Sequence, residues 1–119
     1  MEPIVKVTED FSIAGQITVA DLAAIGAAGY RSVICNRPDA EGGAQQPNFP
    51  EIASAAHAIG LHAAYLPVVL DQINAPEVDS FRQLLIDLPA PVLAYCRSGR
   101  RASTLFQLVR ESTPGPQGD

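Results

Sequence analysis

The chain has 119 residues, 47% of them hydrophobic and 18% charged, a composition typical of one globular domain with a single core. Its net charge of −5 argues against general nucleic-acid binding, and no stretch approaches the roughly 18 apolar residues that a membrane span requires. No signal-peptide pattern is visible and the two cysteines form no disulfide-rich framework, so we expect a cytoplasmic protein.

Apolar periodicity predicts alternating strands and helices. Strands are expected at residues 4–7, 11–17, 31–36, 62–68 and 92–95. Helices are expected at residues 19–28, 50–59, 75–88 and 102–110. The strands that flank the first helix are expected to pair with each other in parallel. This order predicts an α/β domain with a mostly parallel sheet of four to five strands and helices on both faces.

Residues 1–111 are predicted to form this single domain. Residues 112–119 are rich in proline and glycine, cannot contribute to a core, and are expected to be a disordered tail. Residues 37–48 form a long polar loop at the carboxyl end of a strand, the edge where open α/β sheets bind ligands.

One stretch, Cys-Arg-Ser-Gly-Arg-Arg at residues 96–101, concentrates the reactive and basic side chains between a strand and a helix. Four of the eight basic residues fall between Arg97 and Arg110. A tight loop at a helix start aims backbone N–H groups and the helix dipole at one point, which favours the thiolate form of Cys96. Free cysteine is more often a small buried hydrophobe, but three neighbouring arginines cannot enter an apolar core. We therefore predict a nucleophilic cysteine that binds a small anion.

This loop resembles the active-site loop of single-domain rhodaneses, with cysteine first, glycine fourth and arginine sixth. Residues 33–39, 60–68 and 91–99 resemble the phosphatase-like domain named after beta-lactamase hydrolase-like proteins, and the resemblance spans residues 5–110. It implies a three-layer fold like that of dual-specificity phosphatases, with sulfurtransferase-like chemistry and no cofactor. It also implies a sulfide-oxidation enzyme as partner, or a fused domain in relatives.

The length of the loop favours sulfur transfer. Tyrosine phosphatases place histidine before the nucleophile and arginine six positions after it. Here Tyr95 precedes Cys96, and Arg101 lies five positions after it, with Ala102 as the last residue of the anion-binding loop. A shorter loop surrounds a smaller group, such as a terminal sulfur on cysteine. We expect a rhodanese-type sulfurtransferase that moves sulfane sulfur through a Cys96 persulfide, from thiosulfate or a small persulfide to a thiol or cyanide.

Two alternatives stay open. The first is a cysteine-dependent phosphatase, in which Asp71, 25 residues before Cys96, is the general acid. Aspartate in such a loop more often helps to start the next helix. The second alternative is a non-catalytic module that binds an anion or a partner protein.

The remaining loop residues have narrower predicted roles. Arg101 closes the loop and points inward, while Arg97 and Arg100 present charge to the anionic donor. Ser98 donates to the bound sulfur or shapes the turn. Gly99 meets a backbone requirement that a Cβ atom would obstruct.

Three supporting residues lie at the end of the strand at residues 31–36 and in the loop that follows it: Asn36, Arg37 and Asp39. Because this loop lies at the same sheet edge, we expect Arg37 and Asp39 to brace one another or the catalytic loop. The sequence makes no prediction of oligomeric state.

The other candidate ligands and nucleophiles are expected to be structural. His57 and His62 lack metal-ligand spacing with a second histidine or cysteine, so no metal site is predicted. Cys35 ends an apolar strand and is predicted to be a buried thiol, with a disulfide to Cys96 as the alternative.

Overall fold

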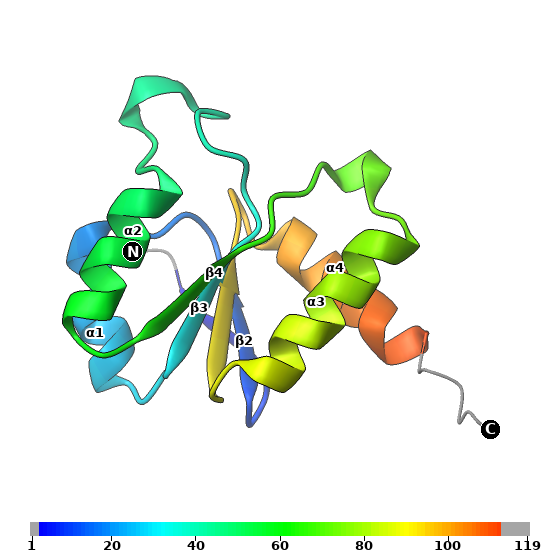
Figure 1. The fold of residues 1–119 in the computed structure, drawn as a ribbon, viewed down its shortest axis with the longest axis horizontal. Helices are drawn as coiled ribbons and strands as arrows, with labels where there is room; N and C mark the ends of the chain where they lie inside the picture. Colours follow the sequence, from blue (N-terminus) through cyan, green and yellow to red (C-terminus); the bar gives the residue numbers. More distant parts are fainter. Residues whose placement is uncertain (1–2, 113–119) are drawn as a thin grey trace.

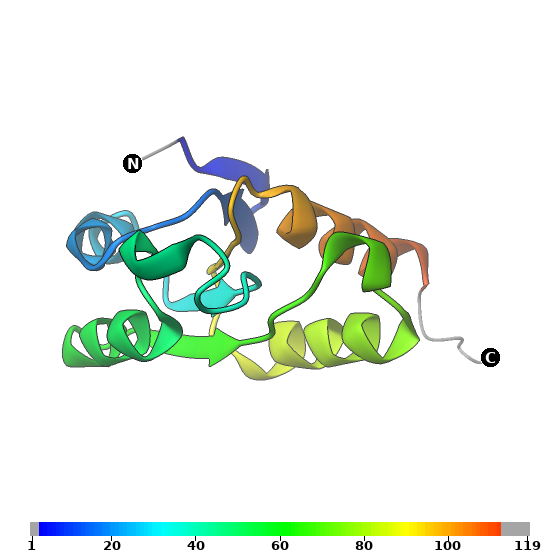
Figure 2. The same ribbon diagram turned by 90° about the horizontal axis from the view of Figure 1, so that it is seen from above.

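The computed structural model describes residues 3–112, which form a five-stranded sheet between two layers of helices (Figure 1). The strands are β1 (Val5–Thr8), β2 (Phe11–Ala14), β3 (Ser32–Cys35), β4 (His62–Tyr65) and β5 (Val92–Tyr95). The helices are α1 (Leu22–Ala27), α2 (Phe49–Ala58), α3 (Ala75–Asp87) and α4 (Arg100–Glu111). Helices α1 and α2 cover one face of the sheet and α3 and α4 the other, as Figure 2 shows from above. The predicted three-layer α/β fold is confirmed.

The sheet has the order β1-β2-β5-β3-β4, with β1 antiparallel to β2 and every other pair parallel. The prediction that the strands on either side of the first helix pair with each other was wrong. Strand β5 lies between them, with Leu93 opposite both Ser12 and Val33. All four residues of β5 are buried, so this apolar strand is most stable where neighbours cover both of its edges as well as its faces.

Several element boundaries differ from the prediction. Strand β4 ends at Tyr65, although the N–H groups of Leu66 and Val68 still donate to the carbonyls of Cys35 and Asn36; the register shifts by one residue between these two bonds, at Pro67. Strand β2 ends at Ala14, and the backbone N–H of Gln16 donates to the Arg97 carbonyl in the loop after β5 instead of to a strand. Three short 3₁₀ helices, η1 (Val19–Asp21), η2 (Gly43–Gln45) and η3 (Leu70–Gln72), were not predicted as such.

Two apolar clusters, one on each face of the sheet, hold these layers together. Alternation along β3 divides its side chains: Val33 and Cys35 belong to the cluster under α1 and α2, and Ile34 to the cluster under α3 and α4. In β5, Leu93 and Tyr95 face the first cluster. The core therefore fixes β5, and with it the position of the residue that follows Tyr95.

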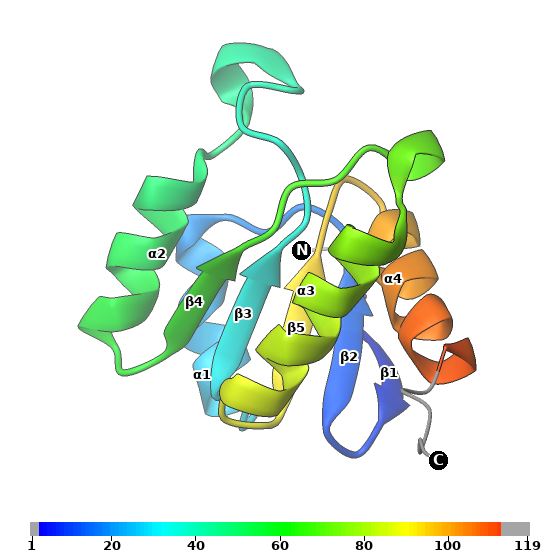
Figure 3. The ribbon, with the colours of Figure 1, turned by 45° about the vertical axis from the view of Figure 1, so that its right-hand side comes forward.

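The carboxyl ends of the parallel strands meet at one edge, where the loops after β3, β4 and β5 leave the sheet (Figure 3).

At the far end of α4, Ser112 accepts two hydrogen bonds of 2.8 Å from Arg82, through its carbonyl and its hydroxyl. Ser112 therefore belongs to the folded domain, whereas the rest of the predicted tail, residues 113–119, lies outside the described residues. None of the helices within residues 3–112 is long and apolar enough to cross a membrane.

Candidate active site

Cys96 follows β5 at the carboxyl edge of the sheet and starts the loop that leads into α4. The backbone N–H of Gly99 donates a 3.1 Å hydrogen bond to its Sγ. Two backbone bonds tie the loop to the segment after β2: Cys96 N–H to the Ala14 carbonyl at 3.3 Å, and Gln16 N–H to the Arg97 carbonyl at 3.2 Å. Cys96 has no exposed surface, so a substrate reaches Sγ only when the covering residues move.

Gly99 is the N-cap of α4 and has a φ of +92°, in the left-handed region. This conformation turns the chain back so that the Gly99 N–H reaches the sulfur at the positive end of the helix dipole. Ser98 shapes the same turn, because its Oγ accepts from the Arg100 N–H at 3.4 Å. Ala102 has its side chain in the core beneath α4.

Arg101 points inward, as the sequence predicts, and its side chain is 13% exposed. Its Nη1 and Nη2 donate to the two carboxylate oxygens of Glu41, each at 2.7 Å, and Nη1 also donates to the Val68 carbonyl at 3.1 Å. The hydrogen bonds to Glu41 raise the pKa of Arg101, and the neighbouring Cys96 raises it further. The guanidinium is therefore a fixed positive charge beside the sulfur.

Glu41, from the loop after β3, joins two arginines. Its Oε1 accepts from Arg37 Nε at 2.8 Å in addition to Arg101, and Arg37 Nη1 donates to Gln16 Oε1 at 3.0 Å. The hydrogen bond from Arg101, supported by Arg37, lowers the pKa of Glu41 to about 2. Sequence reasoning missed Glu41, since nothing in the polar loop distinguishes it from nearby Asp39. It also missed Gln16, which it placed in the strand at residues 11–17.

A cleft of about 510 Å³ lies over this network and is lined by Arg37, Glu41, Gly42, Arg97 and Arg101. Three guanidinium groups outnumber one carboxylate, so the cleft attracts anions. Arg97 is exposed and lines this cleft, whereas Arg100 is exposed and is not among its lining residues.

The supporting residues hold the site indirectly. Buried Asn36 donates through Nδ2 to the Leu66 carbonyl at 2.9 Å. Asp39 accepts from the first N–H of α2, at Phe49, at 2.8 Å. Arg37 and Asp39 therefore do not brace one another: Arg37 is linked to Arg101 through Glu41, and Asp39 stabilises the start of α2.

Asp71 lies on η3, between the Val68 carbonyl that binds Arg101 and the start of α3. Its side chain is exposed. The segment after β4 runs along the carboxyl edge of the sheet toward the N-terminal ends of α3 and α4 (Figure 3). Asp71 is therefore at the same edge of the sheet as Cys96, three residues after Val68, whose carbonyl accepts from Arg101.

Cys35 is buried and, like Cys96, is a free thiol. Its Sγ donates to the Arg37 carbonyl at 3.3 Å, and burial raises its pKa. It pairs across the sheet with Tyr95, whose pKa is also raised by burial.

Residues 3–112 contain no group of three or more His, Cys, Asp or Glu arranged to hold a metal ion.

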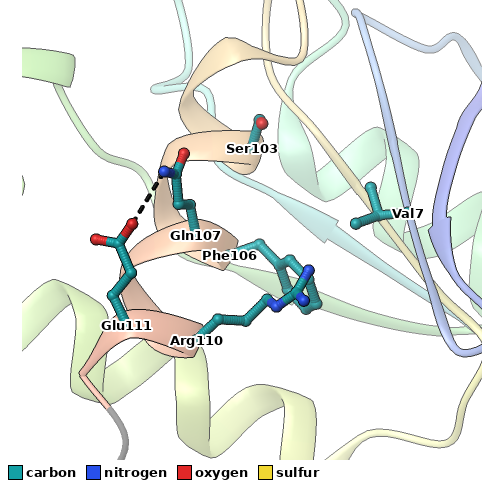
Figure 4. Close-up of a pocket in the computed structure, with 6 residues that line it drawn as sticks. All are labelled: Val7, Ser103, Phe106, Gln107, Arg110 and Glu111. Atoms are coloured by element: carbon teal, nitrogen blue, oxygen red, sulfur yellow. Dashed lines mark hydrogen bonds between the residues drawn. The ribbon is translucent and has the colours of Figure 1, made fainter.

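A second cavity, of about 550 Å³, lies between β1 and α4 away from Cys96 (Figure 4). Val7 lines one side, and Ser103, Phe106, Gln107, Arg110 and Glu111 line the other. Its charged groups have partners, since Gln107 donates to Glu111 at 3.0 Å and the Arg110 guanidinium lies 5.7 Å from the centre of the Phe106 ring.

Comparison with known proteins shows where this architecture belongs. The family model for the phosphatase-like domain of beta-lactamase hydrolase-like protein matches residues 4–112. The chain belongs to this family. The family resemblance predicted from the loop and its flanking strands is therefore confirmed.

The beta-lactamase hydrolase-like protein of Agrobacterium fabrum is 38% identical over 104 residues, which are 87% of this chain and 24% of that protein. The protein of the same name from Xylella fastidiosa is 34% identical over 105 residues, 88% of this chain and 24% of the relative. The chain thus spans about a quarter of the length of these curated relatives.

Among solved structures, a candidate phosphatase from Neisseria meningitidis superposes with a TM-score of 0.82 at 38% identity, covering 96% of this chain and 82% of that one. The core catalytic domain of a PP-IP phosphatase from S. cerevisiae superposes with a TM-score of 0.72 at 13% identity, covering 91% and 64%. The second likeness shows the fold alone.

The domain is thus phosphatase-like. These relatives give no support to sulfur transfer, our main expectation from loop length. The family and the 38%-identical Neisseria structure fit the alternative, a cysteine phosphatase-like hydrolase, better.

Proposed function

We propose that this domain is a cysteine-dependent phosphatase that hydrolyses phosphate monoesters through a Cys96 phosphocysteine. The observation that carries the proposal is the convergence of the Gly99 N–H, the N-terminus of α4 and the Arg101 guanidinium on Cys96. Membership in the phosphatase-like family supports the same reaction class. Arg37 and Arg97 line the cleft and attract the anionic substrate.

In the first step the Cys96 thiolate attacks phosphorus, and a sulfur–phosphorus bond forms as the bond to the ester oxygen breaks. The electron pair leaves with that oxygen, which takes a proton from Asp71 as general acid. The loop N–H groups and Arg101 stabilise the charge on the other phosphate oxygens. Because Cys96 is buried in the described conformation, this scheme requires the residues that cover it to move when the substrate binds.

In the second step a water molecule attacks phosphorus and gives its proton to the Asp71 carboxylate. The sulfur–phosphorus bond breaks, its electron pair returns to Cys96, and inorganic phosphate leaves. Both steps use the same anion site, so no cofactor enters this scheme.

A second candidate is sulfur transfer, and the spacing of five positions from Cys96 to Arg101 favours it. In that reaction the thiolate attacks the outer sulfur of thiosulfate, the sulfur–sulfur bond breaks, and sulfite leaves with the electron pair. The Cys96 persulfide then gives its outer sulfur to a thiol or cyanide.

One experiment separates the two reactions. Wild-type protein and Cys96→Ser are incubated with p-nitrophenyl phosphate, with phosphate release followed, and with thiosulfate, with intact mass followed. We expect phosphate release that Cys96→Ser reduces by at least about 10³-fold. A gain of one sulfur atom without phosphate release would overturn the proposal in favour of sulfur transfer.

A further inference from the structure

We propose that Glu41 is the positioning residue of Arg101: it holds the guanidinium so that one edge remains available to the substrate oxyanion. The proposal rests on the proposed function in one respect only, namely that the bound anion is a phosphate group. The alternative is that Glu41 occupies the anion site itself and blocks it.

The hydrogen bonds of Arg101 decide which edge of the guanidinium is in use. Arginine has five N–H groups in a fixed planar fork. The Glu41 carboxylate accepts one N–H of Nη1 and one N–H of Nη2. The Val68 carbonyl accepts the second N–H of Nη1. Within residues 3–112, no oxygen acceptor takes the N–H of Nε or the second N–H of Nη2, and the further side-chain partner of the guanidinium is Cys96. These two groups share one edge and are parallel, the arrangement that binds an oxyanion in bidentate fashion.

Glu41 and Val68 together fix the plane of the guanidinium. A single contact would let the group rotate about its axis, but three bonds to two partners on different segments prevent rotation. Arg101 is on the first turn of α4, directly after the loop that starts at Cys96, and its contact with Cys96 is among the causes that raise its pKa. Glu41 therefore binds the end of the fork and leaves the side edge to an incoming anion.

Glu41 is itself held in place. Arg37 binds its Oε1 at 2.8 Å, and Gln16 binds Arg37 at 3.0 Å. Gln16 is also tied to the catalytic loop through its backbone bond to Arg97 at 3.2 Å. These bonds therefore connect Arg97, the residue after Cys96, to Arg101 on the first turn of α4.

Gly42 gives independent support, because the loop packs tightly against Arg37. A Cβ atom at Gly42 would lie 2.6 Å from Arg37 Nη2, although its own φ of −95° suits any residue. A side chain at position 42 would therefore have to displace the Arg37 guanidinium, which binds Glu41.

The test compares two reagents of similar size that alkylate Cys96, the anion iodoacetate and the neutral iodoacetamide. Rates at Cys96 are measured by peptide mass spectrometry in wild type, Glu41→Gln, Glu41→Asp and the control Glu9→Gln. Glu9 is an exposed carboxylate that pairs with Lys6. The iodoacetamide rate corrects for changes in access to the buried sulfur, so the ratio of the two rates reports anion binding alone.

We expect the iodoacetate to iodoacetamide ratio to fall about tenfold in Glu41→Gln, the effect of one charge-assisted hydrogen bond. Loss of a nearby negative charge would by itself raise this ratio, so a fall is diagnostic of lost orientation. Glu41→Asp keeps the charge but shortens the reach, and we expect an intermediate ratio. Glu9→Gln should match wild type.

A ratio that rises or stays unchanged in Glu41→Gln would overturn the proposal, and a rise would assign Glu41 to blocking. If Glu41→Gln does not fold, Glu41→Asp decides by the same criterion. The alkylation test requires no phosphate hydrolysis, so its result is independent of whether the proposed phosphatase reaction occurs. Where hydrolysis does occur, we expect Glu41→Gln to raise KM and lower kcat for p-nitrophenyl phosphate.

Discussion

The N–H of Gly99 and the Sγ of Cys96 lie 3.1 Å apart, three residues from each other along the loop. A backbone donor at this position stabilises negative charge on sulfur before it attacks a substrate and again when it becomes the leaving group. The contact depends on the left-handed conformation of Gly99, which an L side chain adopts only with strain.

The first prediction is that Gly99→Ala weakens this contact. A side chain at a φ of +92° costs about 1 kcal/mol or more, and relaxation of that strain moves the N–H away from Cys96. We expect lower stability in urea unfolding and slower alkylation of Cys96 by iodoacetamide.

Gly29→Ala is the matched control for Gly99→Ala. Gly29 lies just after α1 with a φ of +102°, and a Cβ atom there would meet nothing within 4 Å in the described part of the chain beyond its sequence neighbours. The variant should lose similar stability and leave the alkylation rate of Cys96 unchanged. Equal slowing in both variants would show that Gly99 acts through stability alone.

The second prediction concerns acid stability. Because the folded state lowers the pKa of Glu41 to about 2 from 4.5, its ion pairs stabilise the protein above pH 4.5. This contribution is lost as the pH falls from 4.5 to 2, where Glu41 becomes protonated in the folded state too. Glu41 is partly exposed, so we expect a contribution of only about 1 kcal/mol.

The measurement is urea unfolding of wild type and Glu41→Gln from pH 7 down to pH 2. The difference in unfolding free energy should be constant near neutral pH and approach zero at the acid end. A difference that does not depend on pH would contradict an ionised Glu41 as its source.

The third prediction distinguishes the two cysteines by the direction of their hydrogen bonds. Cys35 donates its thiol proton to the Arg37 carbonyl, whereas Cys96 accepts from Gly99. The pKa of Cys35 is also raised by burial. We therefore expect iodoacetamide at pH 7 to label Cys96 at least about tenfold faster than Cys35, as peptide mass spectrometry will measure. Faster labelling of Cys35 would show that the loop does not activate Cys96.

Local sequence was sufficient to predict the strand before Cys96, the helix after it and the special backbone at Gly99, because propensity and spacing determine these features. The central position of β5 was not predictable from local pattern, because the sequence of a buried parallel strand is apolar whichever strands lie beside it. Glu41 was missed for a related reason: its partner Arg101 is 60 residues away in sequence, and only the folded sheet edge brings them together. Loop length pointed to sulfur transfer, because sequence gives the number of residues in a loop but not the direction of each N–H group.

The last prediction tests Asp71 as general acid. Asp71→Asn should slow the hydrolysis of phenyl phosphate by about 10²-fold, because its poor leaving group needs a proton. The effect on p-nitrophenyl phosphate should be smaller, since that oxygen leaves as a stable anion. Asp10→Asn, an exposed aspartate in the turn between β1 and β2, is the control and should match wild type.

Sulfur transfer needs no general acid, so formation of a Cys96 persulfide from thiosulfate should not depend on Asp71. Initial rates for the two esters and the intact mass after thiosulfate treatment, compared between wild type and Asp71→Asn, make this check. If Asp71→Asn slows both esters equally, proton donation is excluded as its role. If it slows neither while Cys96→Ser abolishes hydrolysis, another group protonates the leaving oxygen, and the exposed position of Asp71 on η3 serves only to lead the chain into α3.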